Sequence, residues 1–407
     1  MTMSPSLMDY SPPYSSTSLP LAKLPPSPPA ELDLSLTDKK EDMVLTHSDT
    51  DSFVDSWPSS PDLDLDIEPE TLSKIQQKLE HLWQLYNDGK GLFSRRMLAS
   101  LDAQIDQGVD EVTIEDLDGV RQKYSLKIPE WCMDFTTTSY RISYNSIQNL
   151  TCIHPSFPEL SLREKSPISI CYTSSTEIYH KAPLPEVQAA FTKNAHQWEE
   201  SQTCKDLTRH LTELVKQGRM SKSITKIVGF GLGSTSSLED GFHTVRAHAQ
   251  HAAMKTMARI LAKRKEKEKG HSSRAGSPEI KCYAQDPAYN DVDEGLLSSI
   301  GITTLDDPKG FLEIDESTLV FSVSPNVPVK QVVADVQWPA AMIWNTVYPE
   351  KKEARWEKKV RDGEEFWVVP FTTDPDSQRV RSMVQHYTSM PLRDSNEYFG
   401  DLTIYAM

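Results

Sequence analysis

The sequence predicts an α/β protein: a Rossmann-like, mostly parallel sheet with flanking helices, an N-terminal helical segment and a disordered acidic tail. From residue 224 to about 347, short apolar runs alternate with amphipathic stretches, as in parallel strands joined by crossover helices. The first run ends in a glycine turn, residues 229–234. Residues 1–70 hold 14 acidic residues, three lysines, paired prolines and no glycine. Such a segment buries too little apolar surface to offset its ordering entropy.

The distribution of charge and the spacing of the cysteines argue against several classes of function. The tail carries −11 of the net charge of −16, so the rest is nearly neutral and shows no Lys/Arg cluster for direct nucleic acid binding. The five cysteines are widely spaced and match no zinc pattern, which predicts reduced thiols and no metal site. With no secretory signal and no apolar run of about 18 residues, we expect a soluble protein without membrane association, located in the cytoplasm, the nucleus or both.

The N-terminal part is predicted to be helical and then mixed. Apolar residues at three- and four-residue steps predict helices over 69–86 and 94–107. The alternation at 140–144 predicts a strand. A strand at 168–172 is expected to open the main domain, and a helix over 205–216 ends at a glycine.

The core follows a regular order of strands and helices. Strands are predicted at 224–230, 280–284, 302–305, 318–322 and 340–344, with helices at 245–263, 290–300 and 329–336. An apolar run at 366–371, a helix over 377–387 and a last strand at 402–405 are expected to pack on the same sheet. The predicted domains are a tail (1–70), an N-terminal helical and mixed region (71–166), the Rossmann-type domain (167–350) and a C-terminal extension on its sheet (351–407).

The glycine turn is the first candidate site. Ligands of a parallel sheet bind beyond the C-terminal strand ends, where glycines let the backbone approach a phosphate or ribose. Gly229, Gly231 and Gly233 occupy alternate positions, and Ser234 follows. Ser236 stands where the dinucleotide fingerprint needs its third glycine, so the turn is closer to that of S-adenosylmethionine-dependent methyltransferases. Two interpretations stay open: a nucleotide-type ligand site, or a tight turn that needs small residues for packing.

Other polar residues are predicted at the same edge. Asp286 ends the second strand, where it could bind ribose hydroxyls or simply form an Asp-Pro strand exit. Ser324 and Asn326 follow the fourth strand, where they could contact a ligand or start a helix. His248 and His251 could share a helix face, but no third metal ligand is evident. No nucleophile–base set can be assigned, so the catalytic residues are unknown.

Several segments together resemble the Sensitivity-to-Red-Light-Reduced-like (SRR-like) domain family over about residues 167–350. They are Lys226-Ile-Val-Gly-Phe-Gly-Leu-Gly-Ser234, Gln250-His251-Ala252-Ala253, Tyr283-Ala-Gln-Asp-Pro-Ala-Tyr289, Leu297-Ser-Ser-Ile-Gly-Ile302, Thr318-Leu-Val-Phe321 and Ser324-Pro-Asn326. The acidic tail and the insert at 263–278 resemble filamentous-fungal members. The family is named for a plant regulator of light signalling and the circadian clock, and other members are linked to haem metabolism or microtubules. No reaction is established for it.

The resemblance implies a regulatory protein of unknown biochemical activity, whose Rossmann-like core is a candidate to bind a nucleotide-type ligand and protein partners. The family often shows Pro-His-Cys after the fourth strand, but here Pro325 is followed by Asn326 and Val327, so no thiol or imidazole stands there. The alternative is an S-adenosylmethionine-dependent methyltransferase, favoured by the glycine turn and Asp286. An NAD(P)-linked oxidoreductase is disfavoured by Ser236. The cofactor is open between S-adenosylmethionine and a nucleotide.

Overall fold

The computed structural model describes residues 68–130, 137–162, 166–175, 182–221, 223–269, 279–349, 356–361 and 363–407. The predictions for the tail up to residue 67, for Cys132 and for residues 270–278 of the insert lie outside these ranges. In the described part, no helix is both long enough and apolar enough to span a membrane.

The N-terminal elements carry apolar faces that a core must cover. They are α1 (Pro69–Asn87), α2 (Arg95–Asp106), β1 (Glu111–Glu115), β2 (Arg121–Ser125), β3 (Thr137–Tyr144), α3 (Ile147–Thr151), the 3₁₀ helix η2 (Pro158–Leu162) and β4 (Ile168–Ser175). α1 begins with a proline in its first turn, where no helical hydrogen bond is lost. Ser94 caps α2 by accepting from the Met97 amide at 3.1 Å. Both predicted helices are thereby confirmed.

Seven strands form the central sheet. They are β5 (Lys226–Phe230), β6 (Lys281–Gln285), β7 (Thr303–Thr304), β8 (Thr318–Ser322), β9 (Ala341–Asn345), β12 (Thr388–Leu392) and β13 (Leu402–Ala406). The spatial order is β12-β13-β9-β8-β5-β6-β7. The strands from β9 to β7 are parallel, and β13 runs antiparallel between β9 and β12. The predicted mostly parallel α/β sheet is confirmed.

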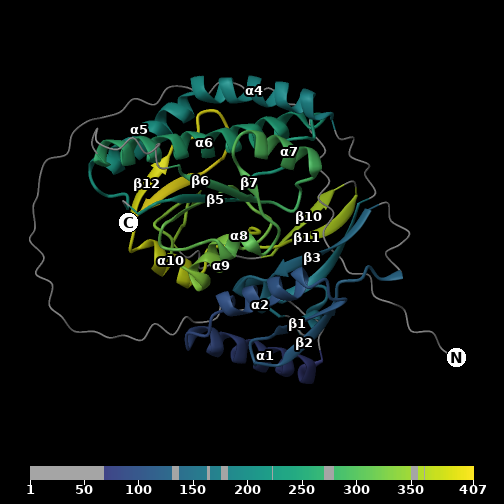
Figure 1. The fold of residues 1–407 in the computed structure, drawn as a ribbon. Coiled ribbons are helices and arrows are strands. Elements are labelled where there is room, and N and C mark those ends of the chain that lie inside the picture. The colour runs from purple at the N-terminus through teal and green to yellow at the C-terminus, as the bar shows by residue number, and fades with distance from the viewer. Residues whose placement is uncertain are drawn as a thin grey trace, which may run out of the picture. The chain divides into compact units, whose positions relative to one another are not determined.

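Helices cover both faces of this sheet (Figure 1). One face carries α4 (Leu184–Glu200), α5 (Gln202–Lys216), α6 (Gly241–Lys269) and α7 (Asp291–Ser299), and the other carries α8 (Lys309–Leu312), α9 (Val329–Val336) and α10 (Gln378–Val384). Alternate residues of β5 join the two hydrophobic clusters: Ile227 packs with the α4–α7 side, and Val228 with the α8–α10 side. Residues of α1, α2 and α3 belong to the second cluster, so the N-terminal elements complete the same core.

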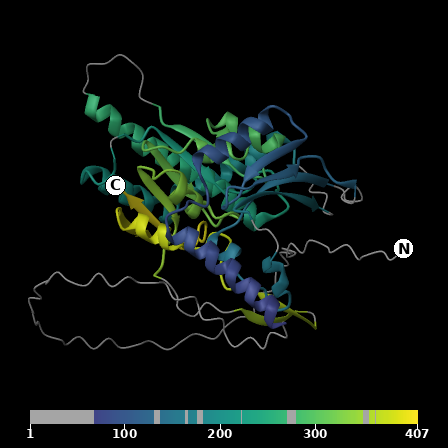
Figure 2. The same cartoon turned by 90° about the horizontal axis from the view of Figure 1, so that it is seen from below.

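Arg379 of α10 ties α1 to the sheet domain. Its guanidinium lies 3.9 Å from the centre of the Tyr86 ring, pairs with Asp335 at 2.9 Å and donates to the Lys90 carbonyl at 2.8 Å. Figure 2 shows α1 and α10 next to each other from below. The planar guanidinium stacks on an aromatic ring and also donates to a carboxylate and to a carbonyl group. Arginine therefore holds α1 against α10 more firmly than a lysine would.

One strand prediction needs correction. The 366–371 run was expected on the central sheet, but β11 (Glu364–Val368) pairs with β10 (Glu357–Arg361) in a separate hairpin. The strand predicted at 168–172 is confirmed as part of β4, which pairs antiparallel with β3 in a two-stranded sheet. Apolar composition predicts a strand but not its partner, because pairing is decided by long-range packing. α4 and β12 were not predicted; β12 contains Pro391, which an edge strand tolerates.

Candidate functional site

The strand order reverses next to β5, and this places the candidate site. From β5 the chain moves outward to β6 and β7, and then returns to β8 on the other side of β5. In open α/β sheets, ligands bind beyond the C-terminal strand ends at such a reversal. The turns after β5 and β8 both lie there. A Cβ on Gly231 would come within 2.9 Å of the Pro325 Cα, so Pro325 packs directly against the glycine turn.

Each glycine of the turn has a packing reason. A Cβ on Gly229 would lie 2.4 Å from the Met254 Cε and 2.7 Å from the Leu232 Cδ1. Gly231 and Gly233 adopt φ of +66° and +78°, which disfavours L side chains. The turn therefore needs glycines because a Cβ would clash with Met254 of α6, with Leu232 or with Pro325, and because two of its residues have a positive φ.

A buried carboxyl group of the chain itself accepts the hydrogen bonds that the turn can donate. Asp293, at the start of α7, is fully buried. It accepts from the backbone amides of Thr235 (2.7 Å) and Ser236 (2.9 Å), and from the Asn290 amide (3.0 Å). The hydroxyls of Ser234, Thr235 and Ser236 also donate to it. Consecutive amides of this kind form an anion-binding concavity, and here the anion is the protein's own side chain.

Asp286 is held in the same way. Its Oδ2 accepts from the Gly233 amide at 2.7 Å, and its Oδ1 accepts from the Ala288 amide at 2.9 Å. Burial raises the pKa of this carboxyl group, although the two amides act in the opposite direction. Asp286 thus lies beside the turn, where the sequence places it, and it already has two backbone donors.

His248 and His251 are buried inside this network and each is neutral. Nε2 of His248 donates to the Thr235 carbonyl at 2.9 Å, and Nδ1 of His251 donates to the Ala247 carbonyl at 2.7 Å. The other ring nitrogens accept from Asn194 at 2.8 Å and from the Tyr289 hydroxyl at 2.7 Å. Burial lowers the pKa of His251 to about 4. With every ring nitrogen engaged, the pair supports the turn. Among the described residues, no three His, Cys, Asp or Glu side chains gather as metal ligands.

The β8 turn contains the strained member of the site. Ser324 is a non-glycine residue at φ +46°, and its amide donates to Asn345 Oδ1 at 2.9 Å. Strain of this kind persists where the surroundings impose it and is frequent at functional sites. Asn326 is exposed. The structure therefore brings Ser324 close to the glycine turn through Pro325 and links it to the end of β9.

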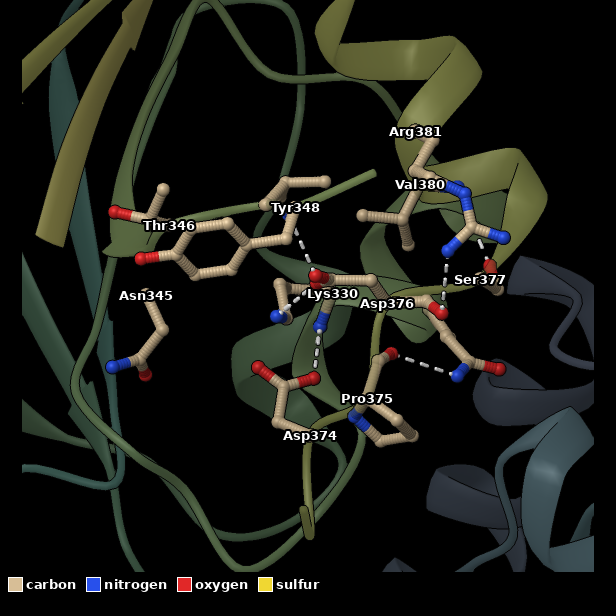
Figure 3. Close-up of polar contacts among 12 residues, drawn as sticks. Lys330, Asn345, Thr346, Tyr348, Asp374, Pro375, Asp376, Ser377, Val380 and Arg381 are labelled. Carbon is tan, nitrogen blue, oxygen red and sulfur yellow. Dashed lines mark hydrogen bonds and ion pairs between the residues drawn. The ribbon is translucent and has the colours of Figure 1, made fainter. Parts of the chain in front are cut away.

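A polar cluster that the sequence did not indicate lies at the ends of β8 and β9; we name Lys330, Asp374 and Asp376 the Lys330 cluster. Lys330 of α9 is buried, its amide donates to Asp374 Oδ1 at 3.0 Å, and its ammonium pairs with Asp376. Tyr348 donates its amide to Asp376 Oδ2 at 3.0 Å. Figure 3 shows Lys330 between Asp374 and Asp376, with Tyr348 beside Asp376. One signal was present: a lysine in the apolar run of α9.

Another acidic side chain, the half-buried Asp307, lies beyond β7. Asp307 Oδ1 accepts from the Tyr144 hydroxyl at 2.5 Å and from Gln285 at 3.0 Å. Burial raises its pKa to about 7, although these two hydrogen bonds lower it. Because Tyr144 belongs to β3, this contact joins the N-terminal hairpin to the sheet edge.

Asp307→Asn should make stability less sensitive to pH. The pKa of Asp307 is about 7 when folded and near 3.8 in its ordinary environment, so the folded state binds the extra proton in between. Its contribution to stability is thus present below pH 4 and lost as pH rises through 7. Denaturant unfolding should be measured at pH 5 and pH 8. Relative to the wild type, the free energy of unfolding of Asp307→Asn should be a few kcal/mol more favourable at pH 8 than at pH 5.

Asp315→Asn provides the opposite control. Partial burial alone would raise the pKa of Asp315, but hydrogen bonds from Ser317 and Lys226 hold it at about 2. Its contribution is present above pH 4 and lost on acidification, so this variant should be destabilised at both pH values. If both variants were stabilised equally relative to the wild type at pH 8, the opposite pKa shifts of Asp307 and Asp315 would be contradicted.

Two surface depressions lie away from the glycine turn. One, of about 520 Å³, is lined by residues that include Phe242, Arg246 and Asp401; the other, of about 590 Å³, lies over α4, α5 and α6. Both have the volume of ligand sites, but neither is lined by Gly229–Ser234, Asp286, Ser324 or Asn326. Their linings mix acids and bases on open surface.

One comparison with known proteins gives a match. The sequence pattern of the SRR1 domain matches residues 204–406, from α5 to the end of β13. The match therefore includes the whole seven-stranded sheet, the glycine turn, the β8 turn and the Lys330 cluster. No curated protein and no solved structure matches the chain. With this match over its sheet domain, the chain belongs to the SRR1 domain family.

Proposed function

We propose that this chain is a regulatory protein that acts by binding protein partners, and that its glycine turn is a structural part of the core. One observation carries the proposal: Asp286 and Asp293 occupy the Gly233, Thr235 and Ser236 amides that a bound phosphate would need. A nucleotide-type ligand would have to displace the fully buried Asp293 carboxyl group and the half-buried Asp286 carboxyl group from 2.7–2.9 Å contacts, which is costly in a low-dielectric environment.

The absence of a ready reaction centre in the turn supports the same function. The histidines nearest the turn are neutral, and their ring nitrogens are engaged. Tyr289, which donates to His251, has a pKa raised well above its ordinary value by burial. A general base must reach a substrate proton, and these groups are committed to internal partners.

A second candidate, an S-adenosylmethionine-dependent methyltransferase, is favoured by the strand order. An antiparallel strand inserted next to the edge of a Rossmann-like sheet, as β13 is here, resembles the arrangement of those enzymes. Asp286 lies where such an enzyme binds ribose. This support is analogy at the level of fold, and fold alone does not assign a reaction.

A ligand panel separates the two functions. S-adenosylmethionine, S-adenosylhomocysteine, NAD, NADP and ATP should each leave the melting temperature of the full chain unchanged. A ligand at 100 times its Kd would add about 2.7 kcal/mol, which corresponds to a shift of several degrees. A reproducible shift with S-adenosylmethionine would favour the methyltransferase. The partner-binding function also requires that the same defined proteins co-purify with the chain from native cells, and an empty result there contradicts it.

A further inference from the structure

A surface groove along α5 and α6 carries an excess of basic side chains. It is the depression of about 590 Å³, and it lies where these two helices pack against each other in the layer that covers one face of the sheet (Figure 1). The charged side chains that line it are Lys205, Arg209, Lys216, Arg259, Glu199 and Glu213. Four are basic and two are acidic, so the lining has a formal charge of +2 on a chain whose net charge is −16. A local excess of this sign attracts an acidic partner.

The basic residues of α5 form a row. Lys205, Arg209 and Lys216 follow one another at steps of four and seven residues, which places them on one side of the helix. The helix rises about 16 Å from the first to the last of them. An extended chain of about five residues has the same length. The row is therefore long enough to contact several consecutive side chains of an extended segment.

α6 adds positive charge on the other side of the groove. From its start at Gly241 to Lys263, α6 contains four basic residues and no Asp or Glu. Of these four, Arg259 lines the groove. Lys263 is exposed and lies one turn further along the same side of α6. The charge that α6 brings to the groove is thus not neutralised by its own residues.

The ion pair already present in the groove is open to exchange. Arg259 meets Glu199 at 3.3 Å, and both side chains are more than half exposed. Exposed pairs of this kind contribute little to stability, because water and salt screen them. A carboxylate from a partner can therefore replace Glu199 beside Arg259 at little cost to the fold.

A peptide with carboxylate side chains fits this lining better than a nucleic acid does. The half-buried hydroxyl groups of Thr208 and Thr212 lie in the groove with the basic residues and are able to donate to carboxylates. Among the described residues that line the groove, none is aromatic, so bases would have no ring on which to stack. A nucleic acid carries a charge at every phosphate and would meet Glu199 and Glu213. A peptide can place its acidic side chains opposite the cations alone.

We propose that this groove binds an extended acidic segment of a partner protein, whose carboxylates pair with Lys205, Arg209, Lys216 and Arg259. The inference rests on the partner-binding function proposed above, and it names the surface and the chemistry of the partner. Lys205 and Lys216 are exposed and form no ion pair with a described residue, so both ends of the α5 row are open to the partner. Because these contacts are exposed to solvent, the affinity should fall as salt rises.

The test is fluorescence anisotropy on the full chain with a labelled hexaglutamate peptide, and with hexaglutamine as the uncharged probe. We expect hexaglutamate to bind, hexaglutamine to bind at least about tenfold more weakly, and the hexaglutamate affinity to fall with added NaCl. The double variant Lys205→Glu/Lys216→Glu reverses both ends of the row and should weaken hexaglutamate at least about tenfold. Lys205→Gln/Lys216→Gln removes the charges without adding acids to α5 and should weaken it by a smaller factor. Circular dichroism should show the same helix content in all of them.

The matched control is Lys90→Glu/Arg96→Glu, which changes the net charge by the same amount on the other side of the sheet. Lys90 follows α1 and Arg96 lies in the first turn of α2, and both side chains are exposed. Residues of α1 and α2 belong to the core cluster opposite the one that contains α5. Hexaglutamate should bind this variant within about twofold of the wild type, because salt screens charges so far from the groove.

Three results would overturn the proposal. Hexaglutamate binds no better than hexaglutamine, the two charge-reversed variants lose the same affinity, or a single-stranded oligonucleotide binds more tightly than hexaglutamate and is lost in Lys205→Glu/Lys216→Glu.

Co-purification from native cells separates this inference from the function on which it rests. If the same defined partners co-purify equally with the wild type and with Lys205→Glu/Lys216→Glu, the groove is not their binding site and the proposed function stands. If no partner co-purifies, the proposed function fails, and selective hexaglutamate binding would then support the groove alone.

Discussion

Gly231→Ala destabilises the protein by about 2–5 kcal/mol in denaturant unfolding. An L residue at φ +66° loses about 1–2 kcal/mol, and overpacking against neighbouring atoms typically adds 1–3 kcal/mol. The new Cβ would lie 2.8 Å from the Pro325 Cβ and 2.9 Å from its Cα. Because the obstacle includes backbone of the β8 turn, no rotamer change relieves it. The midpoint of urea unfolding is the measurement.

Gly218→Ala is the matched control for this prediction. Gly218 follows α5 at φ +68°, but nothing lies within 4 Å of its would-be Cβ. The free energy of unfolding of Gly218→Ala should fall only by the conformational cost of a positive φ, about 1–2 kcal/mol. The difference between the two variants then measures the Pro325 contact. Equal losses would show that the contact carries no energy. A folded Gly231→Val that had lost a response to a nucleotide would instead assign the turn to ligand binding.

Asp293→Ala should destabilise the protein by about 3–5 kcal/mol. The substitution leaves the buried amides of Thr235, Ser236 and Asn290 without their acceptor, along with the hydroxyl donors of the turn. Each unsatisfied buried group is destabilising by about 1–3 kcal/mol, and the losses are not additive. Asp293→Asn keeps one oxygen and should lose less. Thermal and urea unfolding of the three proteins give the ranking directly.

Glu294→Ala controls for the neighbouring acid. Glu294 is exposed in the same first turn of α7, so its removal should change stability by less than about 0.5–1 kcal/mol. Formate should restore part of the stability of Asp293→Ala, because a small anion can take the place of the missing carboxyl group among its donors. A loss no larger than that of Glu294→Ala would contradict the internal-anion role of Asp293.

The candidate site was only partly predictable. Position along a parallel sheet placed Gly231, Gly233, Asp286 and Ser324 at one edge, and the structure finds them there. Local sequence could not reveal that Asp293 fills the turn, because the contact joins residues nearly 60 positions apart. The Lys330 cluster likewise depends on the loop before α10, which approaches α9 only in the folded chain.

The sequence by itself determined the alternation of strands and helices from β5 to β9, the glycine turn between β5 and α6, and the membership of residues 204–406 in the SRR1 domain family. These features depend on local periodicity, on backbone conformation and on ordered motifs, which short stretches encode. Only the tertiary structure shows that β11 pairs outside the central sheet and that β13 lies antiparallel beside β9. It alone also shows that carboxyl groups accept the hydrogen bonds of the glycine turn. Strand partners and buried hydrogen bonds are set by long-range packing, and no local pattern specifies which distant residue will fill a given space.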